Sequence, residues 1–333
     1  KPFDKDAELR KPFLKLEHVL SGASAPAKKL CQIQFIKTTE VDTYHEEVMV
    51  YKVKNEKGKL VALFYADFFP RSGKRAGAWM TSFKPQYQLQ GQQHRPHVSI
   101  VCNFTKPTKK SPSLLTFNEV TTLFHEFGHA LHGMLANTNY PSLSGTNVAW
   151  DFVELPSQLM ENWCYEKEAL ELFARHYESS EVIPMQWIEN IKAAGRFQQG
   201  MQTLRQLSFG LLDMSWHGQD PSSIKDIKAH EKNVFKSLQL FPDIKENCMS
   251  TAFAHIFQGG YSSGYYSYKW AEVLEADAFA YFKKNQLFDT EIASKLKTHI
   301  LSQGGIENPE VLYKRFRGKK ASNKALLERA GLQ

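Results

Sequence analysis

The chain has 333 residues, of which 42% are hydrophobic and 23% are charged, and its formal net charge is +7. This is the composition of an ordinary soluble protein with room for one large domain or two, and no apolar run approaches the roughly 20 residues that a membrane span needs. The positive excess is dispersed except at residues 314–320, which we interpret as a solvated basic tail, and because no nucleic-acid-binding module accompanies it we expect neither nucleic acid nor a membrane as a partner.

The cysteines lie far apart, and no two form a Cys-x-x-Cys pair. They are Cys31, Cys102, Cys164 and Cys248. This spacing favours neither a zinc–cysteine cluster nor a disulfide framework. We therefore expect reduced thiols. The opening Lys-Pro-Phe-Asp-Lys-Asp does not resemble a signal peptide, and together these features predict a cytoplasmic location, with the periplasm as the alternative.

The first part of the chain, residues 1–110, predicts mixed α and β structure. Prolines interrupt residues 1–46, where we expect one short helix over residues 26–31. The apolar pattern then alternates. It predicts strands over residues 48–53, 60–67 and 97–103, with a hairpin turn at 55–58.

Residues 71–80, between the second and third of these strands, are rich in glycine and basic side chains. We interpret this segment as a plain loop. The alternative is an edge segment that pairs with an extended peptide by strand addition.

The second part, residues 111–333, reads almost entirely as helix with short Gly, Pro or Asn-Asp interruptions. The predicted helices lie near residues 117–136, 152–175, 184–215, 222–239, 249–257, 265–284, 290–302 and 309–316. With no clear linker, we expect residues 1–333 to be one mainly α unit with a small β-sheet near its N-terminus.

The helix near residue 116 carries the strongest chemical signal. Thr116 followed by Glu119 predicts a capping box, and the residues after it place apolar side chains on one face. His125 and His129 are one turn apart on the same face, which suits zinc, a metal that binds histidine nitrogen at about 2.0–2.1 Å. Glu126 is placed to accept a proton from water at such a metal.

Chance occurrence and ordinary packing are the alternatives to a metal site. A bare His-Glu-x-x-His also arises by chance, and a single histidine in a helix is more often packed or exposed than a ligand. The cap, the apolar face and a suitable third ligand together favour a metal site. His132 points nearly the same way as His125, and we interpret it as a residue that supports a ligand or faces substrate, because Glu126 is placed for His125 and His129.

Catalytic zinc needs a third protein ligand and an open position. Glu154, 25 residues after His129, is the candidate, presented by a second helix packed on the first. Glu161 lies two turns further on the same face and could hold the free N–H of a ligand histidine. Asp151 is the other candidate for that role, or it caps a helix. The alternative for Glu154, Glu161 and Asp151 together is a solvent-exposed acidic face with no metal.

The segment 252–270 combines one histidine with three glycines and four tyrosines. Glycines permit close backbone approach, and phenols can donate hydrogen bonds to a developing oxyanion. From the residues alone, an aromatic core segment with a glycine turn is the favoured interpretation.

Three motifs together resemble the thimet oligopeptidase/neurolysin family of zinc peptidases, and within it the peptidyl-dipeptidase (dipeptidyl carboxypeptidase) branch. They are His125-Glu-Phe-Gly-His-Ala-Leu-His, then Leu143-Ser-Gly-Thr-Asn-Val followed by Asp151-Phe-Val-Glu-Leu-Pro-Ser-Gln, and finally His255-Ile-Phe-Gln-Gly-Gly-Tyr-Ser-Ser-Gly-Tyr-Tyr-Ser-Tyr. The resemblance runs over essentially the whole chain. It implies a neurolysin-like metallopeptidase domain with a deep channel that admits short peptides as substrates.

The resemblance also implies roles for single residues. One zinc ion per chain would be bound by His125, His129 and Glu154. Glu126 would act as general base and then as proton donor to the leaving amine. Tyr268 would stabilise the oxyanion, and two residues would lie near the substrate, namely His255 and Tyr261. The resemblance also favours a substrate-lining role for residues 71–80.

Length is the main departure from the family. Full-length relatives are roughly twice as long, so this chain looks like the C-terminal catalytic half, and the N-terminal half would be its partner in forming the channel. We expect release of C-terminal dipeptides from short peptides. The alternatives are internal cleavage, or a half that holds zinc and peptide but is inactive without the N-terminal half.

Overall fold

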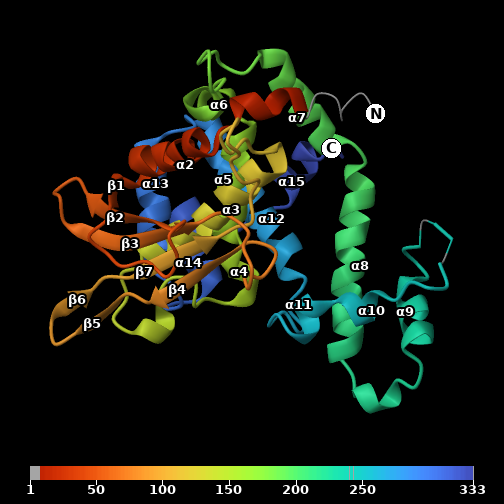
Figure 1. Ribbon diagram of the computed structural model, residues 1–333. Coiled ribbons are helices and arrows are strands. Elements are labelled where there is room, and N and C mark those ends of the chain that lie inside the picture. Colours follow the sequence, from red (N-terminus) through yellow and green to blue (C-terminus); the bar gives the residue numbers. More distant parts are fainter. Residues whose placement is uncertain (1–7, 240, 243, 333) are drawn as a thin grey trace.

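The computed structural model describes residues 8–239, 241–242 and 244–332. Helices dominate it, and a five-stranded sheet and a two-stranded ribbon come from the N-terminal third of the chain (Figure 1). The predicted mainly α fold with a small sheet near the N-terminus is confirmed. Within these ranges every helix is too short or too polar to span a bilayer.

The strands are β1 (Ile33–Thr38), β2 (Met49–Asn55), β3 (Leu60–Asp67), β4 (Trp79–Lys84), β5 (Tyr87–Leu89), β6 (Gln92–His94) and β7 (His97–Val101). The helices are α2 (Leu16–Cys31), α3 (Phe117–Met134), α4 (Trp150–Val153), α5 (Leu155–Glu161), α6 (Lys167–Phe173), α7 (Met185–Arg196), α8 (Gln199–His217), α9 (Ile227–Phe235), α10 (Met249–Ala252), α11 (Ala254–Phe257), α12 (Ser267–Lys284), α13 (Thr290–Leu296), α14 (Pro309–Arg317) and α15 (Lys324–Arg329). Single 3₁₀ turns and one π-helical turn (Lys297–Leu301) complete the list.

The five-stranded sheet has the order β1-β2-β3-β7-β4. Its first three strands are antiparallel, β3 and β7 run parallel, and β4 pairs antiparallel with β7. The three predicted strands are confirmed as β2, β3 and β7. The prediction missed β1 and β4, which lie at the two edges of the sheet, where side chains are less buried and the alternation is weaker.

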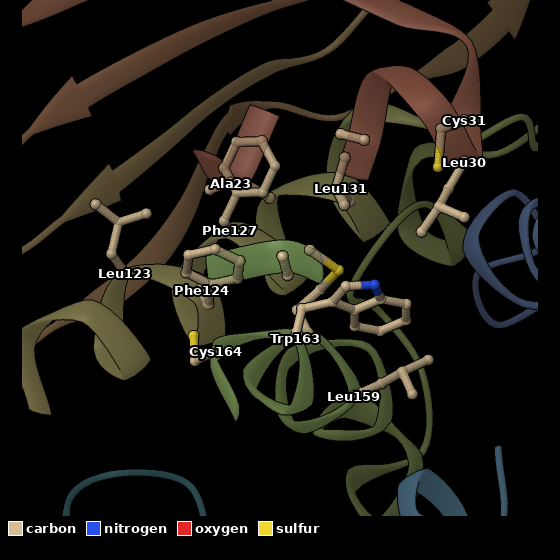
Figure 2. Close-up of a cluster of buried hydrophobic side chains, with 14 of the residues drawn as sticks. Ala23, Leu30, Cys31, Leu123, Phe124, Phe127, Leu131, Leu159, Trp163 and Cys164 are labelled. Atoms are coloured by element: carbon tan, nitrogen blue, oxygen red, sulfur yellow. The ribbon is translucent and has the colours of Figure 1, made fainter. Parts of the chain in front are cut away.

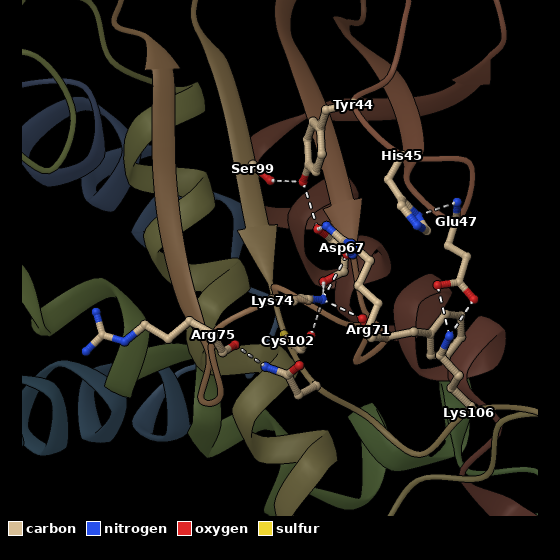
Figure 3. Close-up of polar contacts among 12 residues, drawn as sticks. Tyr44, His45, Glu47, Asp67, Arg71, Lys74, Arg75, Ser99, Cys102 and Lys106 are labelled. Atoms are coloured by element: carbon tan, nitrogen blue, oxygen red, sulfur yellow. Dashed lines mark hydrogen bonds and ion pairs between the residues drawn. The ribbon is translucent and has the colours of Figure 1, made fainter.

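The loop between β3 and β4 is fixed by one buried carboxylate (Figure 3). Asp67, 1% exposed, accepts hydrogen bonds from Arg71 (2.7 and 2.9 Å) and from Lys74 (2.8 Å). Lys74 Nζ also donates to the carbonyl of Cys102 at 2.6 Å, which ties the loop to the end of β7. The plain-loop interpretation of residues 71–80 is right except at its end, where the last two residues begin β4.

The short helix predicted over residues 26–31 is wrong in extent, because α2 begins ten residues earlier and contains Pro26. An interior proline costs a helix about 3 kcal/mol. Here the whole apolar face of α2 is buried against α3, α6 and α13, and this burial offsets the cost. Ala23 and Leu30 lie on that face, above the side chains of α3 (Figure 2).

The prediction of a helix near residues 117–136 is confirmed as α3, including its capping box. Thr116 Oγ1 accepts the N–H of Glu119, whose carboxylate accepts the N–H of Thr116. The apolar face packs beneath the sheet and around Trp163, which is 0% exposed (Figure 2). One end and one face of α3 are therefore fixed before any metal is considered.

Two predicted helices are broken in the structure. The helix predicted over residues 152–175 is four segments: α4, α5, a 3₁₀ turn and α6, with Pro156 in the first turn of α5. The helix predicted over residues 184–215 is divided at Gln198, whose φ of +55° is left-handed. Pro156 in the first region, and Gly195 and Gly200 on either side of Gln198, are the signals of interruption that the apolar period outweighed in the prediction.

The remaining predicted helices correspond to observed ones with shifted ends. Residues 222–239 contain α9 and the end of a 3₁₀ turn (Pro221–Ser223), and residues 249–257 contain two short helices, α10 and α11. The segments 265–284 and 309–316 match α12 and α14, and residues 290–302 match α13 with its π-helical continuation. The prediction missed α15.

The basic run at residues 314–320 is not simply a solvated tail. Its first half belongs to α14, and Arg317 pairs with the buried Asp277 of α12 at 2.9 Å. Lys314 forms an ion pair with Glu310 at 3.1 Å on the surface of the same helix.

Helix α8 stands beside the main body and carries α9 and α10 on its far side (Figure 1). We call residues 199–252 the α8–α10 arm. A small separate core joins the arm to α11, built on Leu212, Phe253 and Ile256. Figure 1 shows α11 between the arm and α12, so this core connects the arm to the segment that precedes α12.

Candidate metal centre

Helix α3 places the two histidines of the motif together. The rings of His125 and His129 have centroids 4.9 Å apart and an interplanar angle of 83°. The helical spacing puts one above the other, and both Nε2 atoms face the same neighbour, Glu154.

The third side chain, Glu154, lies close to the histidines because α5 crosses α3 at Gly128. A Cβ on Gly128 would lie 2.4 Å from the carbonyl oxygen of Pro156 and 2.5 Å from the Cα of Ser157. Only glycine permits this approach, and it brings Glu154, at the start of α5, to the histidines. Glu154 Oε2 is 3.3 Å from His125 Nε2 and 3.2 Å from His129 Nε2.

This donor set fits zinc. His125, His129 and Glu154 each offer one donor atom, and the three atoms lie within 4.8 Å of one another. Two imidazoles with one carboxylate, leaving a further position open, are a catalytic rather than a structural zinc set. Ser157 Oγ donates to Glu154 Oε2 at 3.0 Å and holds the carboxylate in place.

Without a metal, the charges of neighbouring side chains change the pKa values of His125 and Glu154. Burial favours neutral His125, but the carboxylates of Glu154 and Glu161 outweigh burial and raise the pKa of His125 well above its usual range. Burial likewise raises the pKa of Glu154, but hydrogen bonds and charge from both histidines lower it well below its usual value. A metal ion must displace the proton on the His125 imidazole, so metal affinity should fall as pH falls.

Glu161 supports the first histidine from behind. Its Oε1 lies 2.6 Å from His125 Nδ1, leaving Nε2 directed at Glu154. Such a contact fixes the orientation and tautomer of a ligand histidine. Asp151, the rival for this role, instead accepts a hydrogen bond from Tyr266 Oη at 2.9 Å, and the residue at the cap of α4 is Ala149. Both interpretations of Asp151 are therefore wrong.

Glu126 is next to this centre and poorly paired. It is 5% exposed, and its Oε2 has no hydrogen-bond partner among the residues that the structure describes. Burial raises the pKa of Glu126 above its usual value. A buried carboxylate with a raised pKa and a free oxygen is suited to accepting and returning a proton.

His132 is not substrate-facing. It is fully buried, and neither ring nitrogen has a hydrogen-bond partner within the described ranges. Burial, with the charge of His129, lowers the pKa of His132 to about 3. This histidine is therefore a neutral interior side chain of α3.

The tyrosines of segment 252–270 reach the centre from the opposite side. Tyr261 Oη donates a hydrogen bond to Glu154 Oε1 at 2.9 Å. The rings of Tyr261 and Tyr268 stack with centroids 5.0 Å apart. Burial and then the charge of Glu154 raise the pKa of both phenols, so both remain hydrogen-bond donors. His255 is exposed, with its ring 6.2 Å from that of Tyr261.

Two supporting residues were missed by the sequence reasoning. Ser157 follows Glu154 by three residues, a spacing that favours a local side-chain contact and could have been noticed. Asp213, which contacts the tyrosine segment from α8, gave no signal, because its partners Ser263 and Tyr265 lie about 50 residues away.

Comparisons with known proteins match this chain to peptidases. The model of peptidase family M3 matches residues 2–332. Oligopeptidase A of Salmonella typhimurium is 39% identical over 331 residues, which cover 98% of this chain and 48% of that protein. Dipeptidyl carboxypeptidase of Escherichia coli is 37% identical over 333 residues, which cover 99% and 49%. The chain thus spans about half the length of these relatives.

One solved structure, described as "The Structure of CHT", aligns with a TM-score of 0.51. The alignment covers 97% of this chain and 60% of that one, at 13% sequence identity. At this identity the likeness concerns the fold alone.

Proposed function

This chain belongs to peptidase family M3, and from that premise we propose that it hydrolyses short peptides with one zinc ion held by His125, His129 and Glu154. The observation that carries the proposal is the convergence of these three donors beside Glu126, a buried carboxylate with a free oxygen. A group of three donors with a base is typical of metal-assisted hydrolysis rather than of structural zinc.

Bound zinc would supply Lewis-acid chemistry, lowering the pKa of water and polarising the scissile carbonyl. Glu126 accepts the proton of the attacking water through its free Oε2 and later returns it to the leaving amine. The Tyr268 phenol donates a hydrogen bond to the carbonyl oxygen as that oxygen gains negative charge. Glu161 holds the His125 ring in the orientation that binding requires.

Tyr261 has a different role in this proposal from that of Tyr268. Its hydroxyl already donates to Glu154, so it orients the third ligand and stacks against Tyr268. His255 lies on the exposed side of these tyrosines, where a peptide would pass. The edge strand β4, which follows the anchored loop, is the surface that we propose for an extended peptide.

We further propose that the products are C-terminal dipeptides. The motifs resemble the peptidyl-dipeptidase branch, and the chain is 37% identical to a dipeptidyl carboxypeptidase. Internal cleavage by an oligopeptidase is the second candidate, and the chain is 39% identical to an oligopeptidase A. We place the enzyme in the cytoplasm, with the periplasm as the alternative. Because the chain spans half of its relatives, peptide binding would be weaker here than with an N-terminal half present.

Mass spectrometry of products from N-terminally blocked peptides of increasing length tests this proposal. Zinc-loaded protein should produce successive losses of two residues from the C-terminus. Fragments cut from the middle would establish the internal mode instead. Zinc-loaded protein that leaves every peptide intact would contradict the peptidase proposal for this chain.

A further inference from the structure

The segment between α11 and α12 carries Tyr261 and leads directly into Tyr268. We call residues 258–266 the tyrosine loop. Its backbone is left-handed at Gly260 (φ +84°) and at Ser263 (φ +56°). Glycine adopts this conformation easily, but serine does not. Contacts from outside the loop must therefore stabilise its turn at Ser263.

Asp213 of α8 supplies these contacts. It is 0% exposed, and its two oxygens accept the backbone N–H groups of Ser263 and Tyr265, each at 2.9 Å. His217 Nδ1, one turn later on α8, lies 2.7 Å from Asp213 Oδ1. A buried carboxylate is costly unless its oxygens are paired, so these three contacts both stabilise Asp213 and fix the loop against α8.

The contacts lie where α12 begins. The residue at its N-cap, Tyr266, makes no side-chain cap hydrogen bond. A carboxylate near a helix N-terminus satisfies free N–H groups and interacts favourably with the helix dipole. Asp213 lies near this N-terminus, but the amides that it accepts belong to Ser263 and Tyr265, just before the first turn of α12. The first-turn amides of Ser267 and Tyr268 donate to the carbonyls of Gly264 and Tyr265, so the loop that Asp213 holds sets where this turn begins. Tyr268 is in that first turn, so its position depends on where the turn is held.

We propose that Asp213 is a positioning residue that holds the tyrosine loop, and with it Tyr261 and Tyr268, against the metal centre. The route from the carboxylate to the centre is short: the loop amides, the Tyr261–Tyr268 stack, and the hydrogen bond from Tyr261 to Glu154. The proposal rests on the proposed peptidase function, and it assigns to the α8–α10 arm a part in catalysis.

The test is Asp213→Asn in the full chain. The variant keeps the shape of the side chain, but its amide nitrogen cannot accept, so one loop N–H loses its partner and the charge is lost. We expect kcat to fall by about tenfold or more while KM changes by less than about twofold, because the tyrosines are misplaced and not removed. Zinc content should stay at one per chain, and Asp213→Glu should recover part of kcat.

Hydrogen exchange followed by mass spectrometry gives a readout independent of activity. Amides in residues 258–266 should exchange at least about tenfold faster in Asp213→Asn, because local opening becomes easier. Exchange in α3 should not change.

Glu231 offers a matched control. This arm residue accepts the backbone N–H groups of Met249 (2.8 Å) and Ser250 (2.7 Å), the same kind of contact at the start of α10. Glu231→Gln should speed exchange around residues 248–252 and leave kcat within about twofold of the unsubstituted chain.

The proposal is wrong if Asp213→Asn lowers kcat no more than Glu231→Gln does, or if exchange of residues 258–266 is unchanged. Should the unsubstituted chain bind zinc but cleave nothing, the proposed function fails and exchange alone decides. Faster exchange confined to residues 258–266 would then support the positioning role, and unchanged exchange would overturn it.

Discussion

At the residue scale, Glu126 has the most demanding chemical role. It is not one of the three converging donors, so Glu126→Gln should keep one zinc per chain. Its loss as a base should lower kcat by roughly 10²–10⁴-fold. Zinc analysis and peptide cleavage on the same sample check this. A variant that keeps zinc and near-normal cleavage would show that another group accepts the proton.

Tyr268 is the second residue whose role can be isolated. Because its phenol is proposed to act on the developing charge, Tyr268→Phe should lower kcat by about 10²–10³-fold with little change in KM. Tyr266→Phe is the control, since among the residues that the structure describes that hydroxyl donates to Asp151, which is not one of the three donors. A raised KM with unchanged kcat for Tyr268→Phe would make Tyr268 a substrate-binding residue.

Glu275, away from the metal, predicts a pH dependence of stability. Burial raises the pKa of its carboxyl from 4.5 to about 7, although Arg329 and Asn162 contact it. Between these values the folded state holds a proton that the unfolded state has lost. The stability contributed by this group is therefore full below about pH 4.5 and is lost as pH rises through 7.

At about 1.4 kcal/mol per pKa unit, the loss approaches roughly 3 kcal/mol by pH 8. Urea unfolding at pH 5 and pH 8, compared between the natural chain and Glu275→Gln, measures it. The free energy of unfolding of the natural chain, relative to that of Glu275→Gln, should fall as pH rises from 5 to 8. A constant difference would mean that Glu275 is ionised in the fold throughout, paired with Arg329.

At the element scale, the crossing of α3 and α5 determines whether the centre forms. Gly128→Ala would push against main-chain atoms of Pro156 and Ser157, which cannot move aside cheaply. We expect a loss of about 1–3 kcal/mol in the free energy of unfolding, and weaker zinc binding because Glu154 is displaced. Calorimetric zinc titration and urea unfolding check both effects.

Gly195→Ala is the matched control for that substitution. Gly195 is also inside a helix, α7, but a Cβ there meets nothing within 4 Å. Alanine should therefore stabilise by about 0.5–1 kcal/mol and leave zinc affinity unchanged. Equal zinc affinity in Gly128→Ala and Gly195→Ala would contradict the role given to the helix crossing.

Local patterns predicted the elements whose cause is local. Helix α3 follows from its capping box and apolar period, and the seven-residue spacing placed Glu154 and Glu161 near the same histidine although the predicted helix is broken before α5. The edge strands β1 and β4 were missed because their side chains are less buried and their apolar alternation is weak. The break at Gln198 lies between Gly195 and Gly200, a signal that the apolar period across residues 184–215 masked.

The same division applies to the site. Motif spacing predicted the placement of the two histidines, His125 and His129, and of Glu154 and Glu161. The contact of Tyr261 with Glu154 joins residues 107 positions apart, so no motif could predict it. His132 shares the helix face of His125 but is fully buried, and periodicity alone could not show this. Asp213 depends on the placement of a whole helix, which no short pattern encodes.

At the scale of the whole molecule, the three converging donors all lie within a chain that spans about half the length of its relatives. All three donors, the neighbouring carboxylate and the tyrosine loop come from α3, α5 and the segment before α12. The α8–α10 arm leaves apolar side chains of α8 exposed, namely Leu207 (43%), Leu211 (50%) and Met214 (47%).

The most direct test of the central claim is zinc stoichiometry of the purified chain, measured beside cleavage of a short quenched peptide with and without a chelator. The account predicts one zinc per chain and cleavage that the chelator abolishes and added zinc restores. One zinc without cleavage would keep the metal centre but refute the proposed activity for this chain alone. Folded protein that binds no zinc would contradict the assignment of His125, His129 and Glu154, and the mechanism with it.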